Sequence, residues 1–566
     1  LVGNPVSFAM QAKKMLTVLI VSVMVAWEPS LAAEKGDFPG RPDFVASRDF
    51  SWKSLSEPEN LFWPAYFWYW NGPPTPDVLR QQLADMAGHE ARSVCVVPMP
   101  HEFRPVTMNT SMDVDYLSPE FFQRVKVAVD EAARRGMNYW IYDEGGWPSG
   151  LAAGRVVQTR PDVAVRVLRC NADGTWTPDI VAKWAPGEIG VADLLNPEST
   201  RTFISLTHER YAAAVGSHFG KAIKMTFTDE PKYQAAVPGS AVPWPLGAED
   251  VFRRWFGYDA MEALDAFRVT KMQDLTTAQK KARVDLFDFW SRRFRDAYFL
   301  ELRDWTRQHG LASGGHLDNE DDTFAPVSRG FGSVMRPLRA MDVPGVDVIW
   351  RQLWPGKENH HFPKFASSAA HQNGTALALT ESFGVYGNGL TPAQMKWLVD
   401  YQYVRGLTLL VCGVYPLSTR DHLMLGERPH FGPVNPLWDF LPDFHRYVAR
   451  LGYLLSCGKP AIDIGLYYPV RDLWASANPA DAALHDALAR ALLRRQCDFD
   501  IVDDDVLSAQ PARVEDGALM VGAMGYRTIV VGPANCMPPV VQDRLQSLEA
   551  AGGQVIRIDD RSQIDA

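Results

Sequence analysis

Short apolar runs alternate with amphipathic stretches between Phe67 and Pro416, which is the pattern of repeated βα units. The helical stretches carry start signals, as at Ser118-Pro119, where serine can cap a helix and proline fits its first turn. The runs that we interpret as strands cover residues 66–70, 93–99, 138–142, 222–227, 311–315, 346–350, 375–379 and 407–412. Eight such units predict a closed (β/α)8 TIM barrel.

An insertion and a second domain depart from this pattern. Polar and apolar positions alternate over residues 163–192 around the turn sequence Asn171-Ala172-Asp173-Gly174, so a small β excursion is predicted from the third βα loop. After Leu455, strands are predicted at 462–468, 528–531 and 554–558, and helices at 482–493 and 540–551. This indicates a smaller flavodoxin-like α/β domain. Because it has no Gly-x-Gly-x-x-Gly loop, a structural or oligomerisation role is favoured over nucleotide binding.

The N-terminal segment has the order of a secretory signal peptide. Lys13 and Lys14 precede the apolar run 15–27, and Ser30-Leu31-Ala32-Ala33 supplies the small residues of a cleavage site. A membrane anchor is the alternative, but the run is shorter than the ~20 residues that span a bilayer. We therefore expect a secreted or periplasmic protein with no stable membrane insertion after cleavage.

The predicted organisation is a signal peptide (1–33), a catalytic barrel (34–455) with the β insertion near 163–192, and a flavodoxin-like domain (456–566). The chain ends at Ala566 soon after its last predicted strand, which is compatible with truncation of a longer protein.

Composition narrows the function classes. The net charge is -10, and Lys and Arg are scattered rather than gathered in a basic stripe, so nucleic acid is not an expected partner. The 18 Trp residues suit stacking on sugar rings, although tryptophan is also a core residue. The six cysteines include no C-x-x-C pair, so they indicate neither a zinc site nor a disulfide framework. Cys95 and Cys412 lie in apolar runs and are predicted to be buried free thiols.

Acidic residues follow several of the predicted strands. Catalytic groups of a barrel come from the carboxyl ends of its strands, so these positions are the candidates for chemistry. They are Asp143 and Glu144 after the third strand, Asp229 and Glu230 after the fourth, His316, Asp318 and Glu320 after the fifth, and Glu381 after the seventh. A salt bridge or loop cap explains any single acid equally well, but four strand ends that share the feature favour a functional cluster.

Glu230 and Glu381 form the best candidate catalytic pair. They follow strands on opposite sides of the barrel mouth, where one carboxylic acid could protonate a departing glycosidic oxygen and one carboxylate could attack the sugar or activate water. Glu320 is a third candidate for the same site. These residues predict a glycoside hydrolase with a carbohydrate substrate.

Other strand-end residues are candidates for substrate binding. Two glycines after Glu144 allow a sharp turn that brings Trp147 over the cleft, although Trp147 could equally pack the loop. His316 could bind a hydroxyl or be a structural histidine. The substrate-binding set is Trp70, Asn71, Asp143, Glu144, Trp147, Asp229 and His316. The sequence has no Gly-x-Ser-x-Gly elbow, His-Glu-x-x-His motif or phosphate-binding Gly-rich loop, which argues against serine hydrolases, zinc proteases and nucleotide-driven enzymes.

Several strings resemble glycoside hydrolase family 106, the α-L-rhamnosidases. They are Phe67-Trp68-Tyr69-Trp70-Asn71-Gly72, Tyr116-Leu117-Ser118-Pro119, Tyr142-Asp143-Glu144-Gly145-Gly146-Trp147-Pro148-Ser149-Gly150, Phe227-Thr228-Asp229-Glu230-Pro231 and Asn435-Pro436-Leu437-Trp438. The third string is the most specific. The likeness extends from about Phe62 to the second domain, and members of the family usually continue into β-sandwich domains that this chain does not contain.

The resemblance implies an inverting α-L-rhamnosidase that cleaves terminal rhamnose from polysaccharides or glycosides. It carries the general acid to Glu230 and the general base to Glu381, and it implies calcium near the bound sugar but no organic cofactor. Asp318 and Glu320 are the residues expected to bind calcium, which prefers oxygen ligands; Asp143 and Asp229 could also contribute. The alternatives are a retaining glycosidase of other sugar specificity and a carbohydrate-binding barrel without catalysis.

Overall fold

The computed structural model describes residues 40–104, 108, 110–181, 190–358, 360–420, 427–510 and 512–564. The predicted signal peptide lies outside the described residues. Within them, no helix has both the length and the apolar character needed to cross a membrane.

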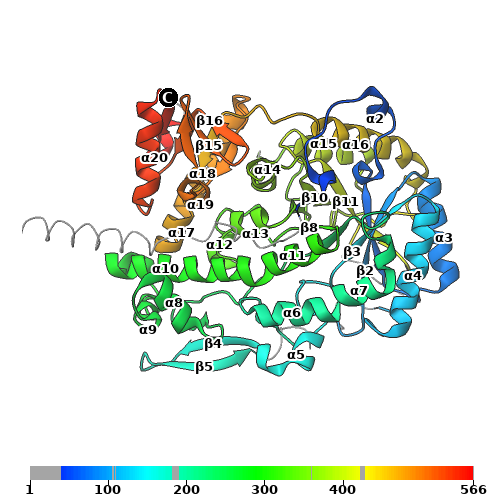
Figure 1. The fold of residues 1–566 in the computed structure, drawn as a ribbon, viewed down its shortest axis with the longest axis horizontal. Helices are drawn as coiled ribbons and strands as arrows, with labels where there is room; N and C mark the ends of the chain where they lie inside the picture. Colours follow the sequence, from blue (N-terminus) through cyan, green and yellow to red (C-terminus); the bar gives the residue numbers. More distant parts are fainter. Residues whose placement is uncertain are drawn as a thin grey trace, which may run out of the picture.

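A closed parallel barrel forms the body of the protein and confirms the predicted TIM barrel (Figure 1). In the described part of the chain its eight strands follow one another around the wall in the order β1-β11-β10-β9-β8-β6-β3-β2. Their bounds are β1 (Ala65–Trp70), β2 (Ser93–Pro98), β3 (Asn138–Tyr142), β6 (Met225–Thr228), β8 (Ala312–Gly315), β9 (Val343–Val348), β10 (Leu379–Ser382) and β11 (Leu409–Pro416).

Helices surround the barrel, and their N-termini match the capping signals of the sequence. The Ser118 hydroxyl accepts a hydrogen bond from the Phe121 amide, and α4 buries Phe121, Val125 and Val129 against the strands. The helices of this region are α2 (Trp52–Ser56), α3 (Pro76–Gly88), α4 (Pro119–Arg134), α5 (Arg155–Thr159), α6 (Pro197–Leu206), α7 (His208–Val215), α8 (Ala248–Phe256), α9 (Ala260–Ala263), α10 (Thr277–Phe294), α11 (Glu301–Gln308), α12 (Ala325–Ser328), α13 (Met335–Ala340), α14 (Pro363–Gln372), α15 (Pro392–Tyr403) and α16 (Leu441–Leu455). A π-helical segment, η7 (Arg295–Leu300), joins α10 to α11.

The seventh predicted strand is displaced along the chain. It was expected at 375–379, whereas β10 begins at Leu379. Thr375 instead forms an antiparallel bridge with Ala46, and the Ala376 amide donates to the Val45 carbonyl, so an N-terminal segment pairs with the residues just before the strand. The prediction was wrong here because this long-range pairing leaves no local sequence signal. As a result, Glu381 lies inside β10 rather than after it.

The β excursion predicted near 163–192 is present as an antiparallel hairpin of β4 (Val165–Cys170) and β5 (Trp176–Val181). The sequence did not predict its third partner, β7 (Ala241–Pro243), which pairs with β4 from the segment after β6. The hairpin therefore joins the loops that follow two neighbouring barrel strands, β3 and β6.

Residues after α16 form a smaller α/β unit, drawn in orange and red in Figure 1. Its parallel sheet has the order β13-β12-β17-β18, built from β12 (Ile464–Tyr467), β13 (Asp500–Val502), β17 (Thr528–Val531) and β18 (Gln554–Arg557). An antiparallel meander of β14 (Arg513–Glu515), β15 (Ala518–Val521) and β16 (Met524–Tyr526) was not predicted. The helices are α17 (Val470–Ser476), α18 (Pro479–Arg494), α19 (Asp504–Ser508) and α20 (Pro539–Ala550).

The barrel and this C-terminal unit share buried apolar surface. Leu466, Trp474 and Ile501 belong to the same apolar cluster as the barrel core, whereas Val502 and Ile529 belong to a second cluster within the unit. The flavodoxin-like classification and the domain boundary at residue 455 remain predictions. Cys95 and Cys412 are buried and unpaired, as predicted.

A buried arginine links the two parts electrostatically. Arg336 of α13 is 3% exposed and its Nη2 donates to Asp288 Oδ1 of α10 at 2.6 Å and to Asp505 Oδ1 of α19 at 2.8 Å. Burial opposes ionisation of Asp288, but Arg292, Arg336 and Arg471 hold its pKa at about 2. The cluster is therefore stable only while its opposite charges remain together.

We expect Arg336→Met to lower the free energy of unfolding by about 3 kcal/mol or more, because it leaves Asp288 and Asp505 buried with fewer cationic partners. The shift in the chemical denaturation midpoint measures this effect. Arg169→Met, which breaks the exposed ion pair between Arg169 and Asp179, is the control and should cost less than ~1 kcal/mol. Equal losses in the two variants would contradict a special role for the buried pair.

Candidate active site

Neighbouring strands bring the predicted acids together at one end of the barrel. Thr228 of β6 pairs with Gly315 of β8, so Asp229 and His316, which follow directly, lie side by side. On the adjoining part of the wall Glu381 of β10 pairs with Asp347 of β9. Because paired residues of parallel strands lie in one layer, four ionisable side chains from four strands share the same region of the barrel mouth.

His316 is the centre of this cluster. It is fully buried; Nδ1 lies 2.7 Å from the Leu317 carbonyl oxygen, and Nε2 lies 2.8 Å from Glu381 Oε2 and 3.6 Å from Asp229 Oδ1. Burial alone would lower the pKa of His316, but the hydrogen bond to Glu381 and the nearby Asp229 and Asp347 carboxylates raise it well above its usual value. Both ring nitrogens face acceptors, so the side chain is an imidazolium that donates from both.

Asp229 is held on the inner face of the site by fixed donors. The Tyr142 hydroxyl donates to its Oδ2 at 2.6 Å, and its backbone amide donates to Ser149 Oγ at 2.8 Å. Burial and the proximity of Glu381 raise the pKa of Asp229 to about 7, against the opposing effect of His316. Near neutral pH this carboxyl group can therefore carry or release a proton.

Glu230 lies one residue beyond Asp229, with a left-handed backbone (φ 48°) that is unusual for a residue other than glycine. Burial, followed by repulsion from Asp229 and Asp318, raises the pKa of Glu230 well above its usual value, and Lys232 only partly offsets this. Lys232 Nζ is 3.0 Å from Asp318 Oδ2, so Asp318 already has a cationic partner. The protonated form of Glu230 is thus favoured, as a general acid requires.

Glu320 lies beneath the cluster and holds the loop that carries His316. Its Oε1 accepts the Leu317 amide at 2.6 Å and its Oε2 lies 3.5 Å from the Asp347 amide. Glu320 is 2% exposed, and burial raises its pKa to about 7. These contacts favour a supporting role over the direct catalytic role predicted from the sequence, which remains untested.

Asp347 was not singled out from the sequence, although it is the one acid within the eight predicted barrel strands. It is 2% exposed, its Oδ1 has no hydrogen-bond partner among the described residues, and burial and then Glu381 raise its pKa well above normal. An acid inside such a strand must face the barrel interior, and this signal could have identified it. Glu427 was also missed; burial and then Glu381 raise its pKa to about 7.

The third strand end builds an aromatic rim. Gly146 has φ 79°, and a Cβ atom there would lie 2.2 Å from the Phe103 ring, so only glycine fits this turn. Trp147 then packs against Phe103 and Tyr69 with ring centroids 4.7 and 6.1 Å apart, and the Arg104 guanidinium lies 5.0 Å above its ring. Trp147 is half-buried, so loop packing and sugar contact are compatible roles.

Asp143 and Glu144 were both predicted to bind substrate, but their carboxylates accept hydrogen bonds from their own loop. Glu144 is 1% exposed and accepts hydrogen bonds from the backbone amides of Gly145, Leu151, Ala152 and Ala153. Asp143 accepts the Ser149 hydroxyl at 2.6 Å. The geometry favours a loop-forming role for both, and their substrate contact remains a prediction.

Trp70 and Asn71 are placed differently from expectation. Successive residues of a strand face opposite sides, and in β1 Phe67 packs inside the barrel against Tyr142 and Phe227, whereas Trp70 packs outside against Phe121 of α4. Trp70 is fully buried there, which argues against the predicted substrate contact of this residue, and Tyr69 occupies the inward position. Asn71 is buried and exchanges hydrogen bonds with the backbone of Ser418.

Comparison with known proteins assigns the family. A family model described as alpha-L-rhamnosidase, glycoside hydrolase family 106, matches residues 180–561, which is most of the chain. The chain belongs to this family. The fold agrees: the structure of a rhamnosidase from Novosphingobium sp. PP1Y has a TM-score of 0.65 at 14% identity, over 89% of this chain and 69% of that one.

One further solved structure and one curated sequence are similar to this chain. A family 42 beta-galactosidase from G. stearothermophilus has a TM-score of 0.57 at 13% identity, over 90% of this chain and 72% of that one. A curated protein of Formosa agariphila, named a putative beta-glucuronidase, is 25% identical over 219 residues. That match covers 37% of this family 106 chain and only 18% of the curated protein.

The residues predicted to bind calcium do not fit that role in this family 106 site. Asp318 is paired with Lys232, and both oxygens of Glu320 face backbone amides. Asp229, His316 and Glu381 are close enough to share an ion, but His316 offers a nitrogen, whereas calcium prefers oxygen ligands. The calcium expectation therefore gains no support from the predicted pair.

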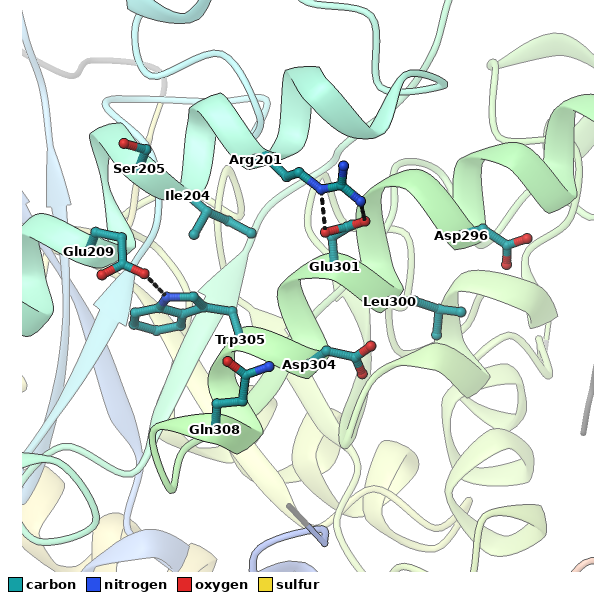
Figure 2. Close-up of a pocket in the computed structure, with 10 residues that line it drawn as sticks. All are labelled: Arg201, Ile204, Ser205, Glu209, Asp296, Leu300, Glu301, Asp304, Trp305 and Gln308. Atoms are coloured by element: carbon teal, nitrogen blue, oxygen red, sulfur yellow. Dashed lines mark hydrogen bonds and ion pairs between the residues drawn. The ribbon is translucent and has the colours of Figure 1, made fainter. Parts of the chain in front are cut away.

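Figure 2 shows a separate hollow on the outside of the barrel, between α6, α7 and α11. The acids that line it are engaged: Glu301 pairs with Arg201, and Glu209 accepts the Trp305 indole at 2.6 Å. Because both carboxylates already have partners on the surrounding helices, we do not interpret the hollow as a second catalytic site. Its acids serve instead as control positions for mutations at the barrel mouth.

We expect His316 to remain an imidazolium at pH 7.5 and the Glu381→Gln variant to lower its pKa, because the substitution weakens the hydrogen bond that contributes most to raising it. Nitrogen-detected NMR of labelled histidine side chains distinguishes the two ring states. Buried His445, whose pKa burial lowers to about 4, should be neutral at the same pH and is the internal control. A neutral His316 at pH 7 would contradict this electrostatic account of the site.

Proposed function

We propose that this family 106 chain is an inverting α-L-rhamnosidase that removes terminal rhamnose from polysaccharides or glycosides. The observation that carries the proposal is the contrast between two glutamates at one barrel mouth. Glu230 has an environment that keeps it protonated, whereas Glu381 accepts a charge-assisted hydrogen bond from His316. Carboxyl groups with opposed environments are the usual arrangement of an acid and a base in glycoside hydrolysis.

In the proposed reaction Glu230 donates its proton to the departing glycosidic oxygen. Glu381, oriented by His316, removes a proton from water as that water attacks the anomeric carbon from the opposite face of the sugar. The carbon–oxygen bond breaks as the new one forms, so one water is consumed and the anomeric configuration inverts. Asp229, in its ionised form, adds negative potential near the positively charged transition state.

The spacing of the strands supports inversion over retention. β9 and β8 separate β10 from β6 in the barrel wall, so Glu381 and Glu230 come from strands three positions apart. Paired residues on adjacent strands, such as Glu381 and Asp347, are only ~5 Å apart at the backbone. The wider placement suits the gap of about 6.5 to 9.5 Å that an attacking water requires.

The charge of the cleft favours a neutral sugar. Asp229, Glu230, Asp347, Glu381 and Glu427 surround the site, and the Lys232 ammonium is already close to Asp318. Because most of these carboxyl groups have raised pKa values, the cleft offers hydrogen bonds rather than the fixed cations that a sugar carboxylate would need, which suits an uncharged sugar. Rhamnose has no charge, and its methyl group suits the aromatic rim of Tyr69, Phe103 and Trp147.

Export from the cytoplasm is also part of the proposal. It is supported by the basic, apolar and small-residue order of residues 13–33. Cell fractionation of the full-length chain, with N-terminal sequencing of the mature protein, tests it; recovery of uncleaved protein in the cytoplasm would oppose it.

We expect Glu230→Gln and Glu381→Gln each to lower kcat on an aryl α-L-rhamnoside by about 10²- to 10⁴-fold, the contribution of a general acid or base. A 2,4-dinitrophenyl leaving group needs no protonation, so it should restore activity to Glu230→Gln but not to Glu381→Gln. Glu209→Gln, in the outer hollow of Figure 2, is the matched control and should keep normal activity. Full activity in both site variants would overturn the assignment.

The pH profile and the product provide a further test. Because Glu230 must be protonated and its pKa is raised, activity should fall as the pH rises through that pKa. Glu230→Gln should lose this alkaline limb on the dinitrophenyl substrate. Proton NMR of the first-formed rhamnose should show the β anomer; the α anomer would indicate retention.

A further inference from the structure

A second group of ionisable side chains lies where the loop after β9 meets the C-terminal unit. His360 and His361 come just before α14, which packs on β9 of the barrel. His485 and Asp486 lie in the middle of α18, in the C-terminal unit. The two segments are distant in the sequence, so any ligand held by both would fasten one part of the fold to the other.

The potential ligand atoms converge. His361 Nδ1 lies 3.8 Å from Asp486 Oδ1, and His360 Nε2 lies 4.0 Å from Asp486 Oδ2. One atom from each of these three residues falls within 4.8 Å of the others. The His485 ring adjoins the group, with its centroid 5.0 Å from that of His361.

Unsatisfied nitrogens point to a missing partner. His361 is fully buried, and neither of its ring nitrogens has a hydrogen-bond partner among the described residues. The same holds for Nε2 of His485, which is 2% exposed. Buried polar groups almost always find partners, and two adjacent buried rings with free nitrogens are costly unless something binds them.

The contacts of Asp486 and His485 leave lone pairs that a metal ion could use. The Thr323 hydroxyl donates to Asp486 Oδ1 at 2.6 Å, and His485 Nδ1 donates to the Tyr467 carbonyl, which leaves the Nε2 lone pair available. Burial and then Arg490 lower the pKa of His360 to about 4, and burial also keeps His361 neutral. Neutral imidazole is the form that binds a metal ion.

We propose that His360, His361 and Asp486 bind a divalent transition-metal ion of the zinc class, with His485 or water at the fourth position. Imidazole nitrogens with one carboxylate suit Zn²⁺, whereas Ca²⁺ and Mg²⁺ prefer oxygen ligands alone. At present the Phe362 amide donates to His360 Nδ1 at 3.2 Å; metal binding through Nε2 places the proton on Nδ1 and ends that hydrogen bond.

Zinc would act as a clamp rather than a catalyst. Tetrahedral ligands at about 2.0 to 2.1 Å from Zn²⁺ lie ~3.4 Å from one another, closer than the separations seen here. Loading therefore draws the segment before α14 and the middle of α18 together, and it stabilises the junction of the two parts. None of the proposed ligands hydrogen-bonds or forms an ion pair with Glu230 or Glu381 among the described residues, so zinc should change stability more than the hydrolytic chemistry.

Metal-free full-length protein, titrated with ZnCl₂ and freed of excess metal by gel filtration, tests the proposal. We expect one equivalent of tightly bound zinc and a rise in Tm of about 3 °C or more, with no such effect from CaCl₂. His361→Ala and Asp486→Asn should each weaken zinc binding by ~100-fold or more and abolish the rise in Tm. His218→Ala, at an exposed histidine paired with Asp130, is the matched control and should bind zinc normally.

Two further variants keep the outcome decisive. If His361→Ala does not fold, the closer substitute His361→Gln should fold and still fail to bind zinc. Glu381→Gln distinguishes this site from the Asp229, His316 and Glu381 cluster, and it should retain the equivalent of zinc. No zinc bound by the unaltered protein, or zinc retained by the His361 variants and lost in Glu381→Gln, would overturn the proposal.

Discussion

A buried positive charge on His316 is the condition under which so many carboxyl groups can share one barrel mouth. Like charges at close range cannot all ionise in a low-dielectric environment, so some of the group must stay protonated. His316 pairs with Glu381 and lies close to Asp229, where its positive charge opposes the rise in the pKa of Asp229. Glu230 lies on the side of Asp318 and retains its proton. One imidazolium thus separates the carboxyl groups into two functional states.

The position of that charge depends in turn on the backbone. Gly315 precedes His316 with φ 144°, and a Cβ atom there would lie 2.0 Å from the Thr228 carbonyl oxygen, so glycine permits the close approach of β6 and β8. Glu320 then holds the Leu317 amide and keeps the loop under the ring. Gly315 and Glu320 therefore help to determine where the proposed catalytic carboxylates lie.

The sequence predicted the elements with local signals and missed those that depend on distant partners. The barrel followed from the alternation of apolar runs, and Glu230, Glu381 and His316 followed from their places near strand ends. The offset of β10 was not predictable, because it depends on pairing with Val45 and Ala46. The outward direction of Trp70 depends on which residue of β1 faces the interior, and Asp347 was overlooked because it lies within a strand rather than after one.

Hydrogen bonds and an ion pair between α14 and the C-terminal sheet connect the C-terminal unit to the candidate active site. α14 packs on β9, which carries Asp347, and also on β13 of the C-terminal sheet. His371 of α14 pairs with Asp500 at 2.9 Å, and Gln372 donates to the Ile501 carbonyl at 2.7 Å. Apolar packing alone would allow α14 to shift along the C-terminal sheet, whereas buried hydrogen bonds fix its position relative to that sheet. The C-terminal unit therefore supports, through α14, strand β9 of the barrel wall, which carries Asp347 and pairs with β10, the strand of the proposed base Glu381.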